Sequence, residues 1–405
     1  MNLSPKTIVT NVLSTFKNAF ESNSAKIHIG NPIVLGLAES NSSPVSIPED
    51  KINCHTLISG TSAERDALLA TILEQQISRG GAVLFLGDQN DSYLLDDIKR
   101  MAEESGRSAD VLVVNPAKIE ESNTYNFVLN GNSNDIADRL MKLMPEGDSE
   151  VGADFNKQLN GQALSVIIDA LRRVNKPFSC LDLAALLTSY NQIENLEVEI
   201  QSQAPESNEA INLSIYIDQF RVVCVSDDDL AVNTIDSNKY GLSTSVIAGR
   251  IFTFGTGLFG QVFNSHSPEV ILSKAISSNK IVYISIPSEK DLASTNLRDM
   301  VMGDIWSAVD SIHAMKFESK PKPAALIFFS RNDNGQSVLS NHYLSGIFEP
   351  ARIANIGIVL IPSNDDSLSS VIGDKFSWTK INTKDNFCSV SFGGVEPIEI
   401  KSHLN

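Results

Sequence analysis

Residues 55–76, HTLISGTSAERDALLATILEQQ, join a short apolar run, a glycine and an amphipathic segment. We expect a buried strand over 55–59, a tight turn that opens on Gly60, and a helix that begins near Ser62. A glycine turn between a strand and a helix is where many proteins hold nucleotide phosphates, with the motif G-x-x-x-x-G-K-[ST]. In that motif the lysine contacts the β- and γ-phosphates, and the hydroxyl binds Mg²⁺.

Counted from Gly60, the second glycine, the lysine and the hydroxyl residue of the motif are replaced by Arg65, Asp66 and Ala67. The Asp66 carboxylate would repel a phosphate, because like unit charges ~4 Å apart cost roughly 4 kcal/mol at an effective dielectric constant near 20. Ala67 has no group that binds a metal, and Arg65 lacks the backbone freedom of glycine. The frame of a nucleotide site is present, but the side chains that perform its chemistry are missing.

The turn also contains residues that could cap the helix without a ligand. Thr61 and Glu64 have the spacing of a capping box, in which two side chains bind the free N–H groups at the start of a helix. Glu64 and Asp66 place negative charge near the positive end of the helix dipole. Taken alone, the stretch therefore also fits an ordinary strand-to-helix turn of an α/β protein.

Length and composition limit the class of protein. A chain of 405 residues is too long for one compact core, so we expect two domains or one domain with a large insertion. The formal net charge of −17 argues against strong nucleic-acid binding, which needs clustered Lys and Arg. The four cysteines and six histidines form no C-x-x-C or H-x-x-x-H pair, so we expect reduced thiols, no metal and no cofactor. No apolar run reaches the ~20 residues of a membrane span, and we expect a cytoplasmic protein without a transmembrane segment.

The order of the apolar patterns suggests an α/β domain interrupted by helices. We expect an N-terminal amphipathic helix over 1–26, packed on the body of the protein or on a partner, an α/β domain over 27–134 and 251–405, and an all-α inserted domain over 135–250. Strands are predicted within 27–47 and over 55–59, 82–86, 111–114, 281–286, 325–329, 356–361, 377–382 and 387–392. Helices are predicted near 62–76 and over 93–104, 136–144, 155–174, 181–190, 193–203, 210–225, 238–252, 294–315 and 344–355, the last broken near Pro350. Continuous apolar strands that alternate with amphipathic helices are typical of a parallel sheet covered on both faces.

Five stretches, in a fixed order, carry further motifs. They are VSIP at 45–48 with HTLISG at 55–60, the strand and turn at 82–91, the segment 106–127 with Gly106-Arg107 and Tyr125-Asn126-Phe127, AISSNKIVYISIP at 275–287, and the helix and strand at 351–361. In this order they resemble the coupling-protein ATPases of conjugation and type IV secretion, the TraD, TraG and DotL-like branch of RecA-type motors. The resemblance covers most of 27–395. It implies a RecA-like P-loop NTPase fold with a parallel-rich central sheet and an all-helical inserted domain.

Compared with that family, the chain departs at the residues that carry phosphate chemistry. The family has two acidic residues after the strand that corresponds to 325–329, one for Mg²⁺ and one that orients the attacking water. Here those places hold Ser330 and Arg331, and Asp333 is interpreted as a loop residue. Of the family's Asp-Pro-Lys-Gly-Asp run, only Asp91 remains, and the sensor glutamine is missing after Ile361. The resulting degenerate nucleotide site comprises Gly60, Thr61, Arg65, Asp66, Ala67, Asp91, Ser330 and Arg331.

The resemblance, with these departures, implies a non-catalytic pseudo-ATPase of a type IV secretion or conjugative DNA-transfer apparatus. It would act by assembly with partner proteins, including an active coupling ATPase, as a homo- or hetero-oligomer that partners hold at the inner membrane. Because RecA-type motors build their sites between subunits, Arg352 is a candidate subunit-interface residue. The alternative for Arg352 is a solvated helix arginine.

Two other hypotheses remain open. An active DNA- or protein-translocating ATPase with an unconventional site would use Arg65 in place of the lysine, and Asp91 or Asp333 for magnesium. The acidic composition argues against the basic pore that such a DNA pump needs. Alternatively, the inserted domain 135–250 recognises a protein substrate or a DNA-processing protein, which is compatible with the pseudo-ATPase hypothesis.

Overall fold

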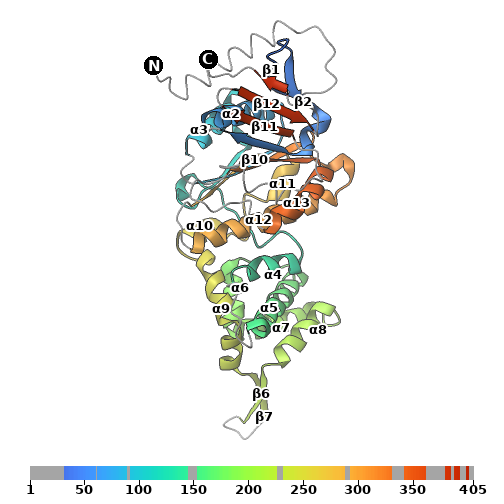
Figure 1. The fold of residues 1–405 in the computed structure, drawn as a ribbon. Coiled ribbons are helices and arrows are strands. Elements are labelled where there is room, and N and C mark those ends of the chain that lie inside the picture. The colour runs from blue at the N-terminus through green and yellow to red at the C-terminus, as the bar shows by residue number, and fades with distance from the viewer. Residues whose placement is uncertain are drawn as a thin grey trace. The chain divides into compact units, whose positions relative to one another are not determined.

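The computed structural model describes residues 32–60, 62–88, 92–144, 153–225, 231–287, 292–330, 342–361, 379–384, 387–392 and 398–400. The chain divides into two compact units, and many of their elements are labelled in Figure 1. Unit 1 comprises Met1–Val113, Leu272–Ser288 and Val309–Asn405, and unit 2 comprises Val114–Ile271 and Glu289–Ala308. The amphipathic helix predicted for 1–26 lies outside the described residues.

Unit 1 is built on a nine-stranded sheet, counted over the described residues, in the order β13-β12-β11-β3-β10-β9-β4-β8-β5. The six strands from β11 to β8 in this order are joined by parallel pairings, whereas β12 and β13 are added antiparallel. The strands are β3 (Thr56–Gly60), β4 (Val83–Asp88), β5 (Val111–Val114), β8 (Ile281–Ile286), β9 (Ala325–Ser330), β10 (Ile356–Ile361), β11 (Thr379–Lys384), β12 (Phe387–Phe392) and β13 (Ile398–Ile400). A separate antiparallel pair, β1 (Ile33–Leu37) and β2 (Pro44–Ile47), precedes them. The predicted α/β fold with a parallel-rich sheet is confirmed.

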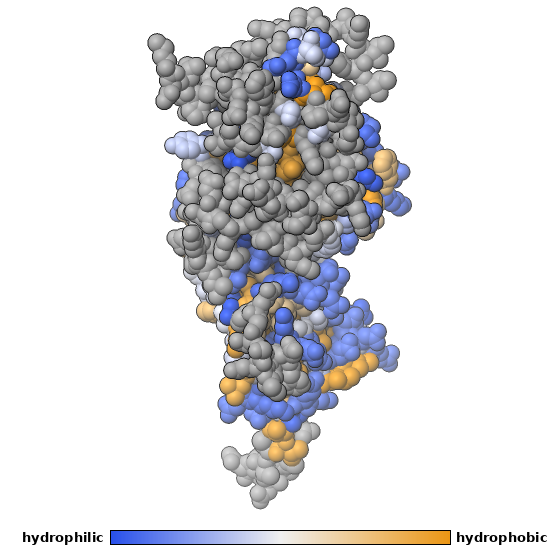
Figure 2. All heavy atoms as spheres, in the orientation of Figure 1, coloured by the Kyte–Doolittle hydropathy of each residue, from blue (hydrophilic) through white to orange (hydrophobic). Residues whose placement is uncertain are grey.

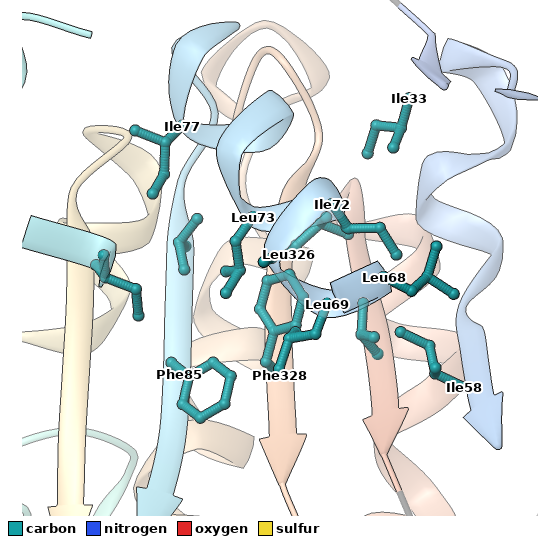
Figure 3. Packing of buried hydrophobic residues seen from close by; sticks show 14 of the residues in the cluster. Ile33, Ile58, Leu68, Leu69, Ile72, Leu73, Ile77, Phe85, Leu326 and Phe328 are labelled. Atoms are coloured by element: carbon teal, nitrogen blue, oxygen red, sulfur yellow. The ribbon is translucent and has the colours of Figure 1, made fainter. Parts of the chain in front are cut away.

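The helices of unit 1 pack on this sheet through apolar side chains at helical spacing. They are α2 (Ser62–Ser78), α3 (Ser92–Glu104), α11 (Leu272–Ser277), the last turns of α12 (Leu292–His313) and α13 (His342–Ile353). On α2, Leu69 and Leu73 are buried against the sheet, where Phe85 stacks on Phe328 with ring centroids 5.8 Å apart (Figure 3). Burial of each such side chain stabilises the fold by roughly 1.5–3 kcal/mol, so α2 is fixed by its apolar face.

Helix α13 differs from the sequence prediction at one residue. The expected break near Pro350 is wrong, because α13 continues to Ile353 with Pro350 inside it. The carbonyl of Pro350 accepts a hydrogen bond from the N–H of Ala354 (2.9 Å), so the helical bonding resumes after the proline.

Unit 2 contains most of the remaining helices and a short hairpin. The helices are α4 (Ser133–Met141), α5 (Ala153–Arg173), α6 (Cys180–Thr188), α7 (Tyr190–Gln203), α8 (Asn208–Asp218), α9 (Ser237–Gly255), α10 (Gly257–Phe263) and α12 up to Ala308. The segment 135–250 predicted as an insertion lies wholly within this unit. Short 3₁₀ helices complete the described elements, at Glu49–Cys54, Ser108–Asp110 and Phe317–Ser319 in unit 1 and at Ile119–Glu121 in unit 2.

The hairpin corrects the prediction that this region is all-helical. The helix expected over 210–225 ends at Asp218, and β6 (Arg221–Val225) pairs antiparallel with β7 (Ala231–Ile235). The physical reason is local: Val222, Val223 and Val225 are β-branched residues that favour extended backbone.

In the described residues no single helix is long and apolar enough to cross a membrane; α9 and α10 together meet that test but bend by 75° where they join.

Candidate functional site

The parallel strands bring their carboxyl ends to one edge of the sheet, where open α/β sheets bind ligands. At this edge β3 ends at Gly60, β9 at Ser330 and β10 at Ile361. The register pairs Ile361 with Ser330, and Gly60 with Thr383 of β11. Helix α2 begins at Ser62, two residues after Gly60. The backbone therefore forms the strand, turn and helix frame that the sequence predicts, beside the ends of the neighbouring strands.

The described residues of the predicted site lie in this frame. Gly60 is the last residue of β3, and Arg65, Asp66 and Ala67 lie in the first two turns of α2. Asp66 is exposed, whereas Arg65 and Ala67 are half-buried. The carboxylate of Asp66, which stands at the position of the motif's lysine, is thus exposed to solvent near the start of α2. Ser330 is placed as the last residue of β9, and Thr61, Asp91 and Arg331 lie outside the described residues.

Two adjacent glutamines fix the far end of α2, and sequence reasoning did not find them. The Gln75 amide binds the backbone of Val34 in β1 twice, since its Oε1 accepts from the N–H (2.8 Å) and its Nε2 donates to the carbonyl (2.7 Å). The fully buried Gln76 donates from Nε2 to the carbonyls of Ala82 and Ala324, each at 2.9 Å. Gln76 follows Ile72 by four residues, so its place on the apolar face of α2 was a usable signal.

His55, just before β3, joins three elements. Its Nδ1 accepts the N–H of Ile358 in β10 (3.1 Å), and its Nε2 donates to the carbonyl of Phe348 in α13 (2.9 Å). Burial lowers the pKa of His55 to about 4; the Phe348 hydrogen bond opposes this shift, and the positive charge of Arg352 adds to it. The ring is therefore neutral at physiological pH and holds one tautomer. The backbone of His55 has φ 67° and ψ 154°, a conformation that costs about 1–3 kcal/mol for a residue other than glycine.

Arg352 lies at the other edge of the sheet. It belongs to the last turn of α13, four residues before β10 begins, and its carbonyl accepts from Asn53 Nδ2 (3.2 Å) in the segment that leads into β3. This is the edge where the parallel strands start. The structure therefore brings Gly60, Asp66 and Ser330 to one edge and places Arg352 apart from them.

The sheet order, the turn after β3 and the helical unit define the RecA-like fold of coupling proteins. Among solved structures, the bacterial conjugative coupling protein TrwBdeltaN70 in its unbound form has a TM-score of 0.55 with 13% identity, over 94% of this chain and 91% of that chain. TrwB in complex with ADP and Mg²⁺ has a TM-score of 0.54 with 13% identity, over 96% of this chain and 92% of that chain.

A second, differently named solved structure gives a similar match. VirB4 of Thermoanaerobacter pseudethanolicus has a TM-score of 0.52 with 10% identity, over 94% of this chain and 98% of that chain. No protein-family model and no curated protein sequence matches the chain. The predicted resemblance to coupling proteins is confirmed for the fold; identities this low carry the fold alone.

Proposed function

We propose that this chain is a pseudo-ATPase that acts by assembly in a type IV secretion or conjugation apparatus, and not by nucleotide hydrolysis. One observation carries the proposal. The strand, turn and helix frame stands at the ligand-binding edge of the sheet, while Asp66 and Ala67 occupy the positions of the lysine and the hydroxyl residue of the motif. Ser330 and Arg331 likewise replace the acidic pair that activates water and holds Mg²⁺.

The frame is held by contacts that need no nucleotide. Gln75 and Gln76 bind backbone groups of β1 and of the segments before β4 and β9, and His55 binds β10 and α13. These bonds, with the apolar packing of α2, support the shape of the domain from within. A fold stabilised in this way can serve as a docking partner without a bound ligand.

The proposed partners are components of a secretion or conjugation apparatus, among them an active coupling ATPase. The similar solved structures are described as a conjugative coupling protein and as VirB4, which supports this choice of apparatus. We place the chain in the cytoplasm, at the inner membrane through its partners, as part of a homo- or hetero-oligomer. In such an assembly Arg352 is a candidate interface residue, since it is exposed at the end of α13.

Calorimetric titration of the full chain with ATP and Mg²⁺ tests the proposal, with an active coupling ATPase as the positive control. We expect no heat of binding at millimolar nucleotide. Micromolar, magnesium-dependent binding would overturn the proposal and favour the alternative, an active translocating ATPase with an unconventional site. Arg65→Ala and Asp91→Asn would then be the first variants to measure, since that alternative gives Arg65 the phosphate and Asp91 the magnesium.

A further inference from the structure

Unit 2 exposes apolar side chains on α7, α8 and β6 that are in contact with solvent over a large part of their surface. We call the group on α7 and α8 the α8 surface; its members are Val198, Ile211 and Ile215, with exposed fractions between 47% and 70%. Val222 and Val223 are neighbours on β6 and so point to opposite faces of the hairpin. Ile211 and Ile215 are four residues apart and so form a ridge on one side of α8. Hydrophobic spheres stand among hydrophilic ones on this part of the molecule (Figure 2). Apolar patches rimmed by polar residues mark interaction sites.

Hydrogen bonds show that the three elements adjoin. Glu197 of α7 accepts from Ser214 Oγ of α8 at Oε1 (2.8 Å) and from Arg221 of β6 at Oε2 (2.5 Å). Gln201, one turn after Glu197, donates from Nε2 to the same Ser214 hydroxyl (3.1 Å). Val198 and Ile215 are the sequence neighbours of Glu197 and Ser214, so the exposed apolar groups of α7 and α8 lie close to each other.

The α8 surface lies in an acidic stretch. Residues 190–225 contain six acidic side chains and one basic side chain, Arg221. Arg221 is neutralised within the unit, because its Nη2 lies 2.5 Å from Glu197 and its Nε lies 2.7 Å from Asp218. Three further cations lie against this stretch: Arg173 and Lys176 pair with Glu209 (3.9 Å) and Glu199 (3.1 Å), and Lys239 donates to the carbonyl of Gln219 (2.8 Å). Its six carboxylates therefore face four cations, and the stretch keeps a small net negative charge. Such a field repels nucleic acid and anionic lipid, and it attracts cationic protein segments.

We propose that the α8 surface binds a basic amphipathic helix of a partner protein. The ridge of Ile211 and Ile215 fits the groove between side chains four apart on another helix, and the acidic surroundings select a helix whose polar face carries Lys or Arg. The charges speed the encounter and exclude acidic partners, while the apolar ridge provides the buried contact. The inference rests on the proposed assembly function, because it names the kind of segment through which a partner attaches.

A defined probe tests the proposal on the full chain. It is a synthetic helix of about 18 residues, long enough to be helical, with leucine at helical spacing and lysine elsewhere. Binding is measured by fluorescence anisotropy, and the same helix with glutamate in place of lysine is measured in parallel. We expect the Ile211→Ser, Ile215→Ser double variant to weaken lysine-helix binding about ten-fold or more, because truncating central apolar contacts costs over 1 kcal/mol each.

The chain offers a matched control on α9. Leu242 and Val246 are also four residues apart, with exposed fractions of 78% and 54%. The Leu242→Ser, Val246→Ser double variant should change the affinity by less than about two-fold, and both variants should keep the wild-type melting temperature because exposed substitutions cost within about 0.5 kcal/mol. Equal losses in the two variants, or equal binding of the glutamate helix, would overturn the proposal.

Two other occupants are separate outcomes of the same design. Sedimentation that shows a dimer of the full chain, lost in the Ile211→Ser, Ile215→Ser variant, would assign the surface to a second copy and overturn the proposal. A peptide of residues 1–26 that binds the α8 surface more tightly than the lysine helix would assign it to this chain's own segment and also overturn it. The nucleotide titration does not involve α8, so failure of this proposal and failure of the pseudo-ATPase proposal remain distinguishable.

Discussion

Arg139 of α4 and Asp304 of α12 form an ion pair, with 3.2 Å between Nη1 and Oδ1, and neither side chain is more than 1% exposed. Tyr125 donates from its hydroxyl to the other carboxylate oxygen (2.6 Å), and Arg139 Nη2 donates to Ser307 Oγ (2.6 Å). Burial raises the pKa of Asp304, and Arg139 opposes that shift. The two buried charges are thus neutralised by each other within unit 2, and each is stabilised in the interior by its partner.

Removing one member of this pair should destabilise the protein strongly. We expect Arg139→Met to lower the free energy of unfolding by about 3–5 kcal/mol, because Asp304 is left buried without its partner. The Arg139→Met, Asp304→Leu double variant should lose less than Arg139→Met alone. Urea denaturation measures both values. Arg100→Met is the matched control: Arg100 binds Glu104 at 3.0 Å on the surface of α3, and its loss should cost less than about 1 kcal/mol. Equal costs for the two arginines would contradict this assignment.

His55 should make the stability of the protein depend on pH. Its pKa falls from 6.5 to about 4 on folding, so the unfolded chain binds the proton more tightly. The free energy of unfolding is therefore highest above pH 6.5, where His55 is neutral in both states. It falls by up to about 3 kcal/mol as the pH falls from 6.5 to about 4, because His55 is protonated first in the unfolded chain. We expect the free energy of unfolding to fall less steeply with falling pH in His55→Asn, since asparagine does not titrate. Identical slopes over this pH range would show that His55 is not the group responsible.

The Gln75 amide should protect the backbone of β1. In Gln75→Ala the N–H and carbonyl of Val34 lose a partner, at a cost of about 1–1.5 kcal/mol. We expect the Val34 amide to exchange its hydrogen about ten-fold faster, as that free-energy difference requires. Hydrogen exchange followed by NMR measures the rate. Ser78→Ala, which removes an exposed hydroxyl of the same helix, is the control and should leave the Val34 rate unchanged.

Restoring the motif should restore nucleotide binding without hydrolysis. The triple variant Arg65→Gly, Asp66→Lys, Ala67→Ser returns the lysine and hydroxyl to the start of α2. Removing a repulsion of roughly 4 kcal/mol predicts a gain in ATP affinity of about a hundred-fold or more in calorimetry. No phosphate should be released, because Ser330 and Arg331 supply no carboxylate. Asp96→Lys, which makes the same charge change as Asp66→Lys but on the exposed face of α3, should not gain affinity; if it does, the effect is one of overall charge.

The sequence predicted best those elements that are continuous apolar runs. Strands β5, β8, β10 and β12 begin and end at the predicted residues. Strands β8 and β10 are buried along their whole length, and a strand buried on both faces has no competing helical pattern. The hairpin of β6 and β7 was missed because Arg221–Val225 follows directly on a helical pattern, and Val222 and Val223 bury little of their apolar surface. The Arg139–Asp304 pair could not be predicted, since its members are 165 residues apart and meet only in the folded unit.

For the candidate site, the sequence correctly predicted where the turn and the strand ends lie, because the carboxyl ends of parallel strands meet at one edge of the sheet. Gly60 and Ser330 therefore lie at the same edge of the sheet. Arg352 was not placed, although topology fixes its position: a helix that leads into a parallel strand ends at the opposite edge. The predicted cap by Thr61 and Glu64 depends on side chains that are not described, and it stays a prediction.

The sheet order has a consequence for synthesis of the chain. The neighbours of β3 are β10 and β11, and Ile358, which binds His55, follows it by 303 positions. At roughly 5–20 residues per second, a ribosome needs about 15–60 s to make that intervening chain. Throughout this time the strand that precedes the turn has neither of its partners. The sheet of unit 1 is therefore completed late in synthesis, and the nascent β3 is an exposed segment to which a chaperone is expected to bind.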